Sequence, residues 1–573
     1  MGEVDFMDYS TLADYYEKLE TVGSKLKKRD ILAELFRNTP TEELPKVVLL
    51  VQGIVFPKFS DHELGVAVQM MIKAISKASG VGVEAVENKF KETGDLGSTA
   101  EYFIKSKKQS TLLKKKLTID MVISNLQSLA FLGGQGSQEK KLSLISELFA
   151  SGSPKEVRYI ARTILEDLRI GVAEGIIKDA IIEAFLAKEN DSKDEKQKIS
   201  NLVEYAYSIV SDLGEVAKIS KTNGIEGLKK VKVQIGKPIQ VMLGLAAESI
   251  EDVVKEFGKI SAQYKYDGSR IQIHRKNEKI WVFTRRLENI TEQFPDIVEL
   301  AKKGLLSKEC VVEGEVLGID RKAGFPVPFQ ILSQRIHRKY EIKKMVKEIP
   351  VRVHLFDVLF ENGKMLFDKP LKERWRILEK IVNPIPGKFE LAKQIVTHDL
   401  KELEKFYAEA LKAGQEGLML KVLDSPYVFG RHVGTMYKIK SVMESLDLVI
   451  IGATWGEGSR ANWLTSYVLA CIDPDTGKFL EVGMMSTGLN EKQYKEITET
   501  LKPLITREKG RTVWVKPKII VEVGYQEIQK SSHYNSGFAL RFPRFRRFRE
   551  NEKTEPDTID RVISLFESQG KKG

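Results

Sequence analysis

A lysine, an aspartate and an arginine lie close together around one tight turn of this chain. Lys265 comes two residues before Asp267, Gly268 completes the turn, and Arg270 follows it. Apolar and polar residues alternate on both sides, as they do in strands, and glycine adopts the positive φ that a reversal needs. Lys265 is therefore expected at the end of a strand, where its side chain is fixed in place. An ordinary hairpin with an exposed lysine is the alternative.

Two more lysines share one face of a strand further along the chain. Lys438 and Lys440 are two residues apart, so their side chains point the same way and can meet one phosphate group. A lysine amine attacks only when it is neutral, and free lysine keeps its proton up to about pH 10.4. Nearby positive charge favours the neutral form, and Arg270, these two lysines and a bound metal ion can supply it. A solvated strand edge guarded by lysines is the alternative.

Two glutamates have the spacing of a metal and sugar surface, and a third begins a separate strand. Glu313 and Glu315 fall on one face of an expected strand from 310 to 317, whose other face is apolar. Glu416 begins a second apolar strand, 417–420, at the rim of the expected site. Carboxylates are protein ligands that Mg²⁺ prefers. A surface salt bridge is the alternative for any one of them taken singly.

The stretch from Lys265 to Arg270 resembles the first nucleotidyltransferase motif of ATP-dependent DNA ligases, RNA ligases and mRNA capping enzymes, in which the lysine is the nucleophile. The whole chain is similar to the three-domain DNA ligase of archaea and eukaryotes. This resemblance implies an enzyme that seals nicks in duplex DNA through a lysyl-AMP intermediate, in replication, repair and recombination. Five further stretches follow in the order that the family shares: 284–288, 312–316, 356–359, 416–421 and 437–440.

The resemblance also implies a role for each matching residue. Lys265 would be the catalytic nucleophile, Phe356 would stack on the adenine, and Glu315 would contact the nucleotide sugar. Glu315 and Glu416 are the residues expected to hold Mg²⁺. The remaining nucleotide contacts are expected from basic side chains: Arg270, Arg285, Arg431, Lys438, Lys440 and, in the arginine-rich tail 541–549, Arg541 and Arg544, which would orient the departing pyrophosphate.

Two positions depart from the family pattern. Gln263 stands where ligases usually have a glutamate that reads the adenine amino group, and Met436 stands where a tryptophan is commoner. A glutamine accepts a hydrogen bond through its carbonyl, but its amide can also donate one. ATP is therefore the expected nucleotide cofactor, with use of ADP or GTP left open.

Length and composition describe a large, soluble, basic protein. A chain of 573 residues is too long for a single core, so roughly three or four domains are expected. The formal net charge of +11, from 91 basic and 80 acidic residues, favours a polyanionic partner such as nucleic acid. Cys310 and Cys471 match no disulfide or metal pattern, which favours the reducing cytoplasm. No signal peptide or bilayer-spanning stretch is expected.

The first 222 residues have the apolar spacing of helices and are expected to form an all-α domain. Two glycine-containing turns in it, 133–138 and 168–172, resemble segments of the ligase DNA-binding domain. Ser137 is expected to cap the helix that follows the first turn, and bare amides at a helix start attract phosphate. Plain interhelical turns are the alternative. The candidate DNA contacts are Ser137, Lys140, Lys141, Arg169 and Gly171.

Two charged stretches interrupt the helical pattern. Gln109 to Leu113 lies where related archaeal ligases bind a sliding clamp, but leucines replace the two aromatic residues of that segment, so a clamp pocket would be filled less well. A solvated basic loop is the alternative there. The stretch 188–198 is expected to be an exposed connection. The expected partners are nicked double-stranded DNA and, through the first stretch, a sliding clamp, with the enzyme acting as a monomer.

Three domains follow from these patterns and from the resemblance. Residues 1–222 would form the all-α DNA-binding domain, 223–442 an α+β adenylation domain on antiparallel sheets, and 443–573 a β-barrel of the OB-fold type. RNA ligases and capping enzymes do not normally carry a large helical domain ahead of the lysine motif. A non-catalytic DNA-binding protein would not need the intact motifs. The strands predicted in the last domain are 446–453, 466–472, 479–484, 512–515 and 518–524.

Overall fold

The computed structural model of the chain groups it into two units by the proximity of Cα atoms. The first unit comprises Met1–Leu245, Asp267–Lys393 and Lys421–Tyr437, and the second comprises Ala246–Tyr266, Gln394–Leu420 and Lys438–Gly573. The structure describes residues 6–106, 116–188, 190–322, 324–327, 329–336, 338, 340–431, 434–440, 444–456, 460, 462–549 and 552–571.

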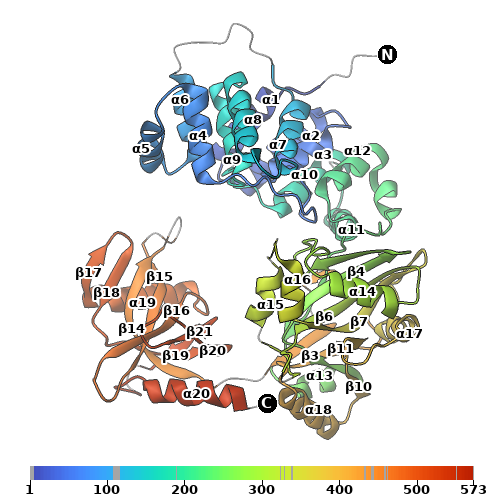
Figure 1. The fold of residues 1–573 in the computed structure, drawn as a ribbon, viewed down its shortest axis with the longest axis vertical. Helices are drawn as coiled ribbons and strands as arrows, with labels where there is room; N and C mark the ends of the chain where they lie inside the picture. The colour runs from blue at the N-terminus through green and yellow to red at the C-terminus, as the bar shows by residue number, and fades with distance from the viewer. Residues whose placement is uncertain are drawn as a thin grey trace. The chain divides into compact units, whose positions relative to one another are not determined.

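The described residues are helical up to the end of α12, as predicted (Figure 1). Side chains start several of these helices: Ser153 and Glu156 form a capping box at α9, and Asp95 caps α6. In the part of the chain that is described, none of the helices combines the length and apolarity that a bilayer span needs. The helices are α1 Tyr9–Thr21, α2 Lys25–Asn38, α3 Leu44–Val51, α4 Val68–Ser79, α5 Val83–Thr93, α6 Leu96–Lys105, α7 Ile119–Ala130, α8 Ser137–Ser151, α9 Pro154–Ile164, α10 Glu174–Phe185, α11 Lys193–Val210 and α12 Leu213–Lys229.

The structure corrects two local predictions in this helical part. Ser137 does not cap α8: it is the first residue of that helix, and Gly136, at φ +78°, takes the cap position without a side-chain hydrogen bond. Residues 190–198 of the stretch predicted as a connection are mostly exposed but partly helical, because Ser192 and Glu195 form a capping box that starts α11. The boundary predicted at residue 222 falls inside α12, where Gly224 interrupts the helical geometry.

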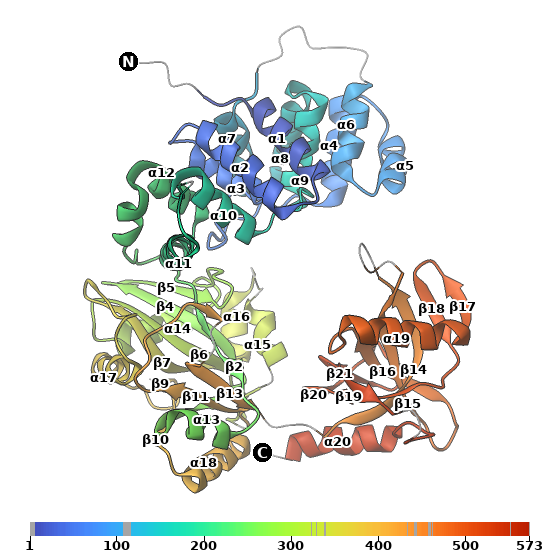
Figure 2. The same cartoon turned by 180° about the vertical axis from the view of Figure 1, so that it is seen from behind.

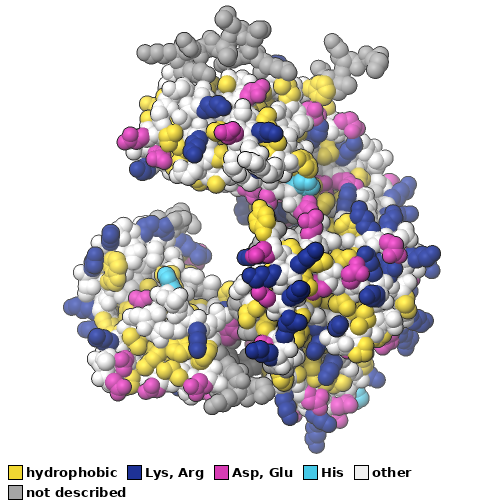
Figure 3. Space-filling view, viewed as in Figure 1, with side chains coloured by type: hydrophobic (Ala, Val, Ile, Leu, Met, Phe, Trp, Pro, Cys, Tyr) yellow, Lys and Arg dark blue, Asp and Glu magenta, His cyan; other side chains and the backbone are white. Residues whose placement is uncertain are grey.

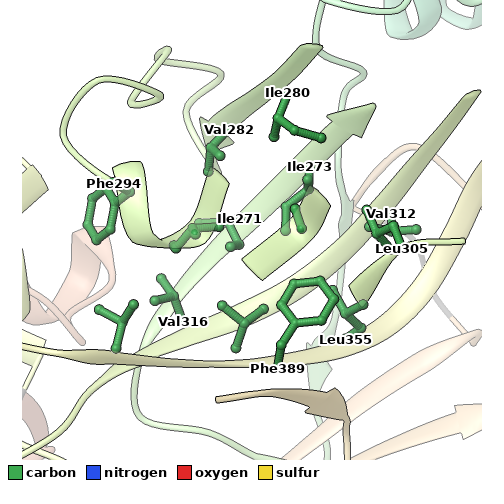
Figure 4. Close-up of a cluster of buried hydrophobic side chains, with 14 of the residues drawn as sticks. Ile271, Ile273, Ile280, Val282, Phe294, Leu305, Val312, Val316, Leu355 and Phe389 are labelled. Carbon is green, nitrogen blue, oxygen red and sulfur yellow. The ribbon is translucent and has the colours of Figure 1, made fainter. Parts of the chain in front are cut away.

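A six-stranded sheet in the first unit has the order β5-β4-β6-β7-β8, with β9 beside β7. Neighbouring strands on the main path are antiparallel, and β9 runs parallel to β7. Ile271, Ile273, Val312 and Phe294 belong to the buried core on one face of this sheet, which fixes β4 and β6 in register (Figure 4). The elements are β4 Ser269–Lys276, β5 Lys279–Thr284, α14 Pro295–Gly304, β6 Glu309–Gly318, α15 Phe329–Ile336, α16 Ile342–Glu348, β7 Val351–Glu361, β8 Lys364–Met365, α17 Leu371–Ile381 and β9 Phe389–Leu391.

A five-stranded sheet has the order β10-β3-β11-β13-β2, and a separate parallel pair joins β1 to β12. Helix α18 packs against β3 and β10 and lies beside α13 (Figure 2). The sheet carries Lys265 at the end of β3 and Lys440 at the end of β13. The elements are β1 Met242–Leu243, β2 Leu245–Ala246, α13 Ile250–Phe257, β3 Ile260–Lys265, β10 Gln394–Thr397, α18 Leu400–Lys412, β11 Gly417–Val422, β12 Gly430–Arg431 and β13 Met436–Lys440.

The C-terminal part is an antiparallel β structure, and all five predicted strands are present in it. Its main sheet has the order β16-β15-β14-β18-β17, with β19 paired to both β14 and β22. The predicted fold class is confirmed, although pairings among the described strands do not close this sheet into a barrel. The elements are β14 Leu446–Trp455, β15 Leu464–Ile472, β16 Phe479–Met485, α19 Glu491–Leu501, η2 Lys502–Leu504, β17 Ile505–Lys509, β18 Thr512–Val515, β19 Ile520–Gly524, β20 Glu527–Lys530, β21 Phe538–Arg541, β22 Arg544–Phe548 and α20 Ile559–Lys571.

Candidate active site

Lys265 is the last residue of β3, as its place before the Asp-Gly turn predicted. Glu416 lies just before the neighbouring strand β11, and its backbone N–H donates to the Lys265 carbonyl at 2.9 Å. The next residue has to be a glycine: Gly417 has a φ of +143°, and a Cβ there would lie 2.2 Å from the carbonyl oxygen of Ile439. This close approach of backbones brings Glu416 beside both β3 and β13.

The carboxylate of Glu416 binds two lysines at once. The Nζ atoms of Lys265 and Lys440 each lie 2.5 Å from Glu416 Oε2. Burial alone would raise the pKa of the Glu416 carboxyl, but the charges of the two lysines outweigh burial and hold this pKa well below its ordinary value. The Lys265 side chain is 18% exposed, so its amine is both fixed and accessible. Three of the predicted site residues thus meet at one carboxylate.

A magnesium ion can be accommodated at Glu416. In the described part of the chain, no group of three or more His, Cys, Asp and Glu side chains is arranged to hold a metal. Mg²⁺, however, usually takes one or two protein carboxylates and completes its shell with waters and substrate phosphates. An oxygen that already attracts two ammonium groups fits that requirement. Glu315, the second predicted ligand, is partly exposed on β6, directly opposite Arg270 in the β4–β6 ladder.

Arg270 is held by a buried network on the six-stranded sheet. Its Nη2 lies 2.7 Å from Glu313 Oε2, and its Nη1 donates to the Met242 carbonyl at 2.5 Å. The Tyr427 hydroxyl donates to the same Glu313 oxygen at 2.9 Å and accepts the Met242 N–H at 2.8 Å. Glu313 is fully buried, so its contacts with Arg270 and Tyr427 are structural. Of the two glutamates, Glu315 is the one that is partly exposed. No local pattern predicted Tyr427, because it is 114 residues from Glu313.

Phe356 presents its ring from β7 beside two cations. Lys421 Nζ lies 4.5 Å from the ring centre, and the guanidinium carbon of Arg270 lies 5.3 Å from it. Burial lowers the pKa of the Lys421 ammonium to about 8. Asp357, the next residue of β7, forms a buried bidentate pair with Arg374 of α17. Arg374 Nε donates to Asp357 Oδ1 at 2.8 Å, and Nη2 donates to Oδ2 at 3.0 Å. Phe356 itself remains partly exposed, so the ring is accessible to a planar ligand.

The remaining predicted nucleotide contacts are less enclosed. Arg285 is exposed in the turn after β5, where Thr284 Oγ1 accepts two backbone N–H groups of the same turn. Lys438 is partly exposed on β13, whereas Met436 on the same strand is buried. The backbone of Arg431 belongs to β12, and its side chain lies outside the described residues.

The arginine-rich tail divides into bound and exposed side chains. Arg541 Nη1 lies 3.1 Å from Glu527 Oε1 on the paired strand β20. Arg547 and Arg549 form ion pairs within the C-terminal part, including a 2.9 Å contact from Arg549 to Asp447. Arg544 is exposed at the start of β22. Of the two predicted contacts, Arg544 is therefore exposed and Arg541 is paired, while Arg547 and Arg549 form ion pairs within the C-terminal part.

The first candidate DNA loop presents one of its two lysines to solvent. Lys140 is exposed and Ser137 is partly exposed at the start of α8. Lys141 is buried, and its Nζ donates to the Leu64 carbonyl at 2.6 Å. Gly65 leaves room for this ammonium group, since a Cβ there would lie 2.8 Å from it. Lys141 is one of the candidate DNA contacts, but α8 turns its side chain toward the loop before α4.

The second candidate loop has a strained backbone held by a buried lysine. Arg169, at φ 61°, and Gly171, at φ 63°, both adopt the left-handed conformation. The Nζ of Lys28, from α2, donates to the carbonyls of Ile170 at 2.6 Å and Gly171 at 3.1 Å. Arg169 is exposed, and its Nε donates to Asp167 at 2.7 Å. Lys28 was not predicted, because it lies on a distant helix.

Lys and Arg side chains also gather over α15 and α16 (Figure 3). On α16, Lys343, Lys344 and Lys347 are exposed. The spacing of these three lysines in the sequence already indicates one basic helix face. The predicted clamp segment from Gln109 to Leu113 lies outside the described residues.

Comparisons with known proteins match all three regions of the chain. The family described as "ATP dependent DNA ligase domain" matches residues 241–440, "DNA ligase N terminus" matches 8–182, and "ATP dependent DNA ligase C terminal region" matches 460–552. A DNA ligase from Nanoarchaeum equitans is 44% identical over 572 residues, which cover 98% of this chain and 99% of that protein. A DNA ligase from Thermococcus onnurineus is 44% identical over 565 residues, covering 98% of each.

A fold comparison agrees with these matches. The solved chain named Pmar-Lig_Pre has a TM-score of 0.54 at 16% identity, with 94% of this chain and 99% of that chain covered. The three family matches and these relatives define the class of this protein as a ligase. The chain belongs to the ATP-dependent DNA ligases, which seal nicks in DNA.

Proposed function

We propose that Lys265 is the nucleophile of the first step of ligation. Its Nζ, after losing a proton, bonds to the α-phosphorus of ATP while the bond to the bridging oxygen breaks, so pyrophosphate leaves and AMP stays on the lysine. The observation that carries this proposal is the 2.5 Å contact between Lys265 Nζ and Glu416 Oε2 at the end of β3. This contact holds the amine of Lys265 in one place, beside a carboxylate.

Glu416 and Glu315 would hold Mg²⁺, which when bound supplies positive charge at the phosphates. Lys265 Nζ, which lies 2.5 Å from Glu416 Oε2, would have to leave this carboxylate in order to reach the α-phosphorus. Lys438 and Lys440, on one strand face, would bind phosphate oxygens through charge-assisted hydrogen bonds. Further phosphate contacts are proposed for Arg270, Arg285, Arg431, Arg541 and Arg544.

The nucleoside would bind through one ring and a set of polar groups. Phe356 would stack on the adenine, a role supported by its partly exposed ring, and Gln263 would face the base. Glu315 would contact the ribose. Buried Glu313 Oε1 and Arg270 Nε have no hydrogen-bond partner among the described residues, so they can accept from and donate to a buried water. ATP is the nucleotide proposed, and ADP and GTP are to be tested beside it.

The later steps transfer AMP to DNA and then displace it. An oxygen of the 5′-phosphate at the nick attacks the AMP phosphorus, and the bond to Lys265 Nζ breaks. The 3′-hydroxyl then attacks the 5′-phosphorus, the strand is joined and AMP leaves. Exposure of Lys140 and Arg169 supports their proposed phosphate contacts, together with Ser137 and the backbone at Gly171. Lys141 would affect DNA binding indirectly, because its Nζ holds the loop before α4 through the Leu64 carbonyl.

We further propose three domains, 1–222, 223–442 and 443–573, with the helical one serving DNA binding. The interruption of α12 at Gly224 supports a boundary close to the first limit. The enzyme would act as a monomer on nicked duplex DNA in the cytoplasm, associated with the nucleoid, in replication, repair and recombination. A sliding clamp is the partner proposed for the segment from Gln109 to Leu113.

Sealing of a singly nicked duplex tests this proposal. The enzyme is incubated with Mg²⁺ and ATP, ADP, GTP or no nucleotide, and joined strands are resolved on a denaturing gel. The Lys265→Ala variant is expected to lose sealing and covalent labelling by AMP completely. Lys259→Ala, which changes an exposed lysine just before β3, is the matched control and is expected to seal normally. Sealing by Lys265→Ala would refute the assignment of the nucleophile.

A further inference from the structure

The amide of Gln263 is held by a side chain from the neighbouring strand. In the antiparallel β3–β10 ladder, Gln263 lies directly opposite Gln394, and Ser261, two residues earlier, shares its face. Gln263 Nε2 donates to Gln394 Oε1 at 2.8 Å, and Ser261 Oγ donates to the same oxygen at 2.7 Å. Gln263 is 2% exposed and Ser261 is 1% exposed. The network is therefore shielded from water, where each hydrogen bond counts most.

This network gives the Gln263 amide a direction. The Gln394 carbonyl oxygen has two lone pairs, and its two donors use both of them. A half-turn of the Gln263 amide would set its carbonyl oxygen against that of Gln394 and leave the Gln263 NH₂ group without this acceptor. Both changes are unfavourable in a buried site. If both amides turned together, the buried Ser261 hydroxyl would lose its acceptor. The NH₂ group of Gln263 thus stays on Gln394, and the Gln263 carbonyl oxygen is the atom left to meet a ligand.

We propose that Gln394, supported by Ser261, makes Gln263 a hydrogen-bond acceptor and thereby selects adenine over guanine nucleotides. Adenine carries an amino donor at the position where guanine carries a carbonyl acceptor. A hydrogen-bond acceptor fixed on the protein therefore accepts from the adenine amino group and repels the guanine carbonyl oxygen. Gln263 then does the work of the glutamate commoner at this position, and Gln394 is a positioning residue. The inference rests on the proposed role of Gln263 in facing the base.

Competing nucleotides provide the test. Initial rates of covalent labelling of the full-length enzyme are measured with ATP and with GTP, each labelled at the α-phosphate, and their ratio is compared between variants. The wild type is expected to prefer ATP by about tenfold or more. Gln394→Leu frees the Gln263 amide to rotate and is expected to lower the ratio about tenfold. Gln394→Glu, which can only accept, is expected to keep the preference.

A double variant separates orientation from damage to the fold. With Gln263→Glu in place, the acceptor no longer needs orienting, so adding Gln394→Leu is expected to leave the ATP preference intact. Equal labelling of the wild type by both nucleotides, or an unchanged ratio in Gln394→Leu, would overturn this inference while leaving the nucleophile assignment standing. Absence of any label on the wild type would overturn the proposed mechanism and this inference with it.

Discussion

Glu416 is the residue on which two lysines converge. The Nζ atoms of Lys265 and Lys440 both lie 2.5 Å from Glu416 Oε2. In the proposed mechanism Lys265 attacks phosphorus, so its amine has to part from this carboxylate first. Lys440 would then remain close to the amine, where it could bind a phosphate oxygen.

Sequence reasoning identified the charged residues of the site but not their partners. Lys265, Glu416 and Lys440 could be predicted because each stands in a short motif. Tyr427, Gln394 and Lys28 could not, because each acts through a hydrogen bond to a residue distant in sequence. Such contacts depend on strand register and loop conformation, which local periodicity does not determine.

Tyr427→Phe is predicted to lower the free energy of unfolding by about 1–3 kcal/mol, because it leaves the buried Met242 N–H without its acceptor and removes one donor from Glu313. The measurement is urea unfolding followed by circular dichroism. Tyr16→Phe is the matched control: the Tyr16 hydroxyl is buried without a hydrogen-bond partner, so its removal is expected to cost nothing. A Tyr427→Phe variant as stable as the wild type would contradict the anchoring role.

At the scale of elements, the predicted helices and strands largely agree with the structure because their apolar spacing is regular. The strands of the C-terminal part were predicted to within a few residues. Local predictions were wrong where the cap residue determines the start of a helix: Gly136 precedes α8, and Ser192 precedes α11. A left-handed glycine or a reciprocal cap can move a helix start without changing the apolar pattern around it.

Asp95→Asn tests how α6 is joined to α9. Asp95 caps α6 through the backbone N–H of Gly97, at 2.9 Å, and binds Arg162 of α9 at 2.7 Å. Burial would raise the pKa of Asp95, but hydrogen bonds and charge from Arg162 and Ser98 outweigh it and lower this pKa to about 2. The folded-state pKa thus lies below the unfolded value of about 3.9. Charged Asp95 therefore stabilises the fold above about pH 4, and this stability is lost as the pH falls toward 2.

Asparagine keeps the cap but not the charge. Asp95→Asn is therefore expected to lower the free energy of unfolding by about 2 kcal/mol near neutral pH. The difference from the wild type should shrink as the pH falls from about 4 to about 2. Urea unfolding of both proteins across this range makes the comparison, and a difference that does not change with pH would be the contrary result.

Lys28→Met tests the loop that carries Arg169. Loss of two hydrogen bonds from a buried ammonium should release the carbonyls of Ile170 and Gly171. Affinity for nicked DNA is expected to fall about tenfold, measured by fluorescence anisotropy, while AMP labelling of the enzyme stays unchanged. Lys27→Met, at the exposed neighbouring position on α2, is the control and should bind DNA like the wild type. Unaltered affinity in Lys28→Met would remove the loop from the DNA interface.

At the scale of the whole molecule, one chain must supply different groups to successive chemical steps. Lys265 is proposed to act in the first two, whereas the arginines of the tail are proposed to act on pyrophosphate in the first step only. Arg544 is exposed at the start of β22, so its substitution should not disturb the C-terminal sheet. The net charge of +11 adds a general attraction to DNA that is weakened by salt.

Arg544→Ala is predicted to slow AMP labelling by ATP about a hundredfold, yet to seal a nick already carrying AMP on its 5′-phosphate at the normal rate. The two reactions are followed separately by gel assay. Arg547→Ala is the control, because this arginine pairs with Glu522 and Glu552 and should affect stability more than labelling. Equal loss of both reactions in Arg544→Ala would contradict a role confined to the first step.

The central claim is that AMP becomes attached to Lys265. Peptide mapping by mass spectrometry, after incubation of the enzyme with ATP and Mg²⁺ in the absence of DNA, tests this claim most directly. The predicted result is a single AMP adduct on Lys265 that disappears when nicked DNA is added. An adduct on Lys438, Lys440 or any other residue, or nick sealing without an adduct on Lys265, would contradict the account.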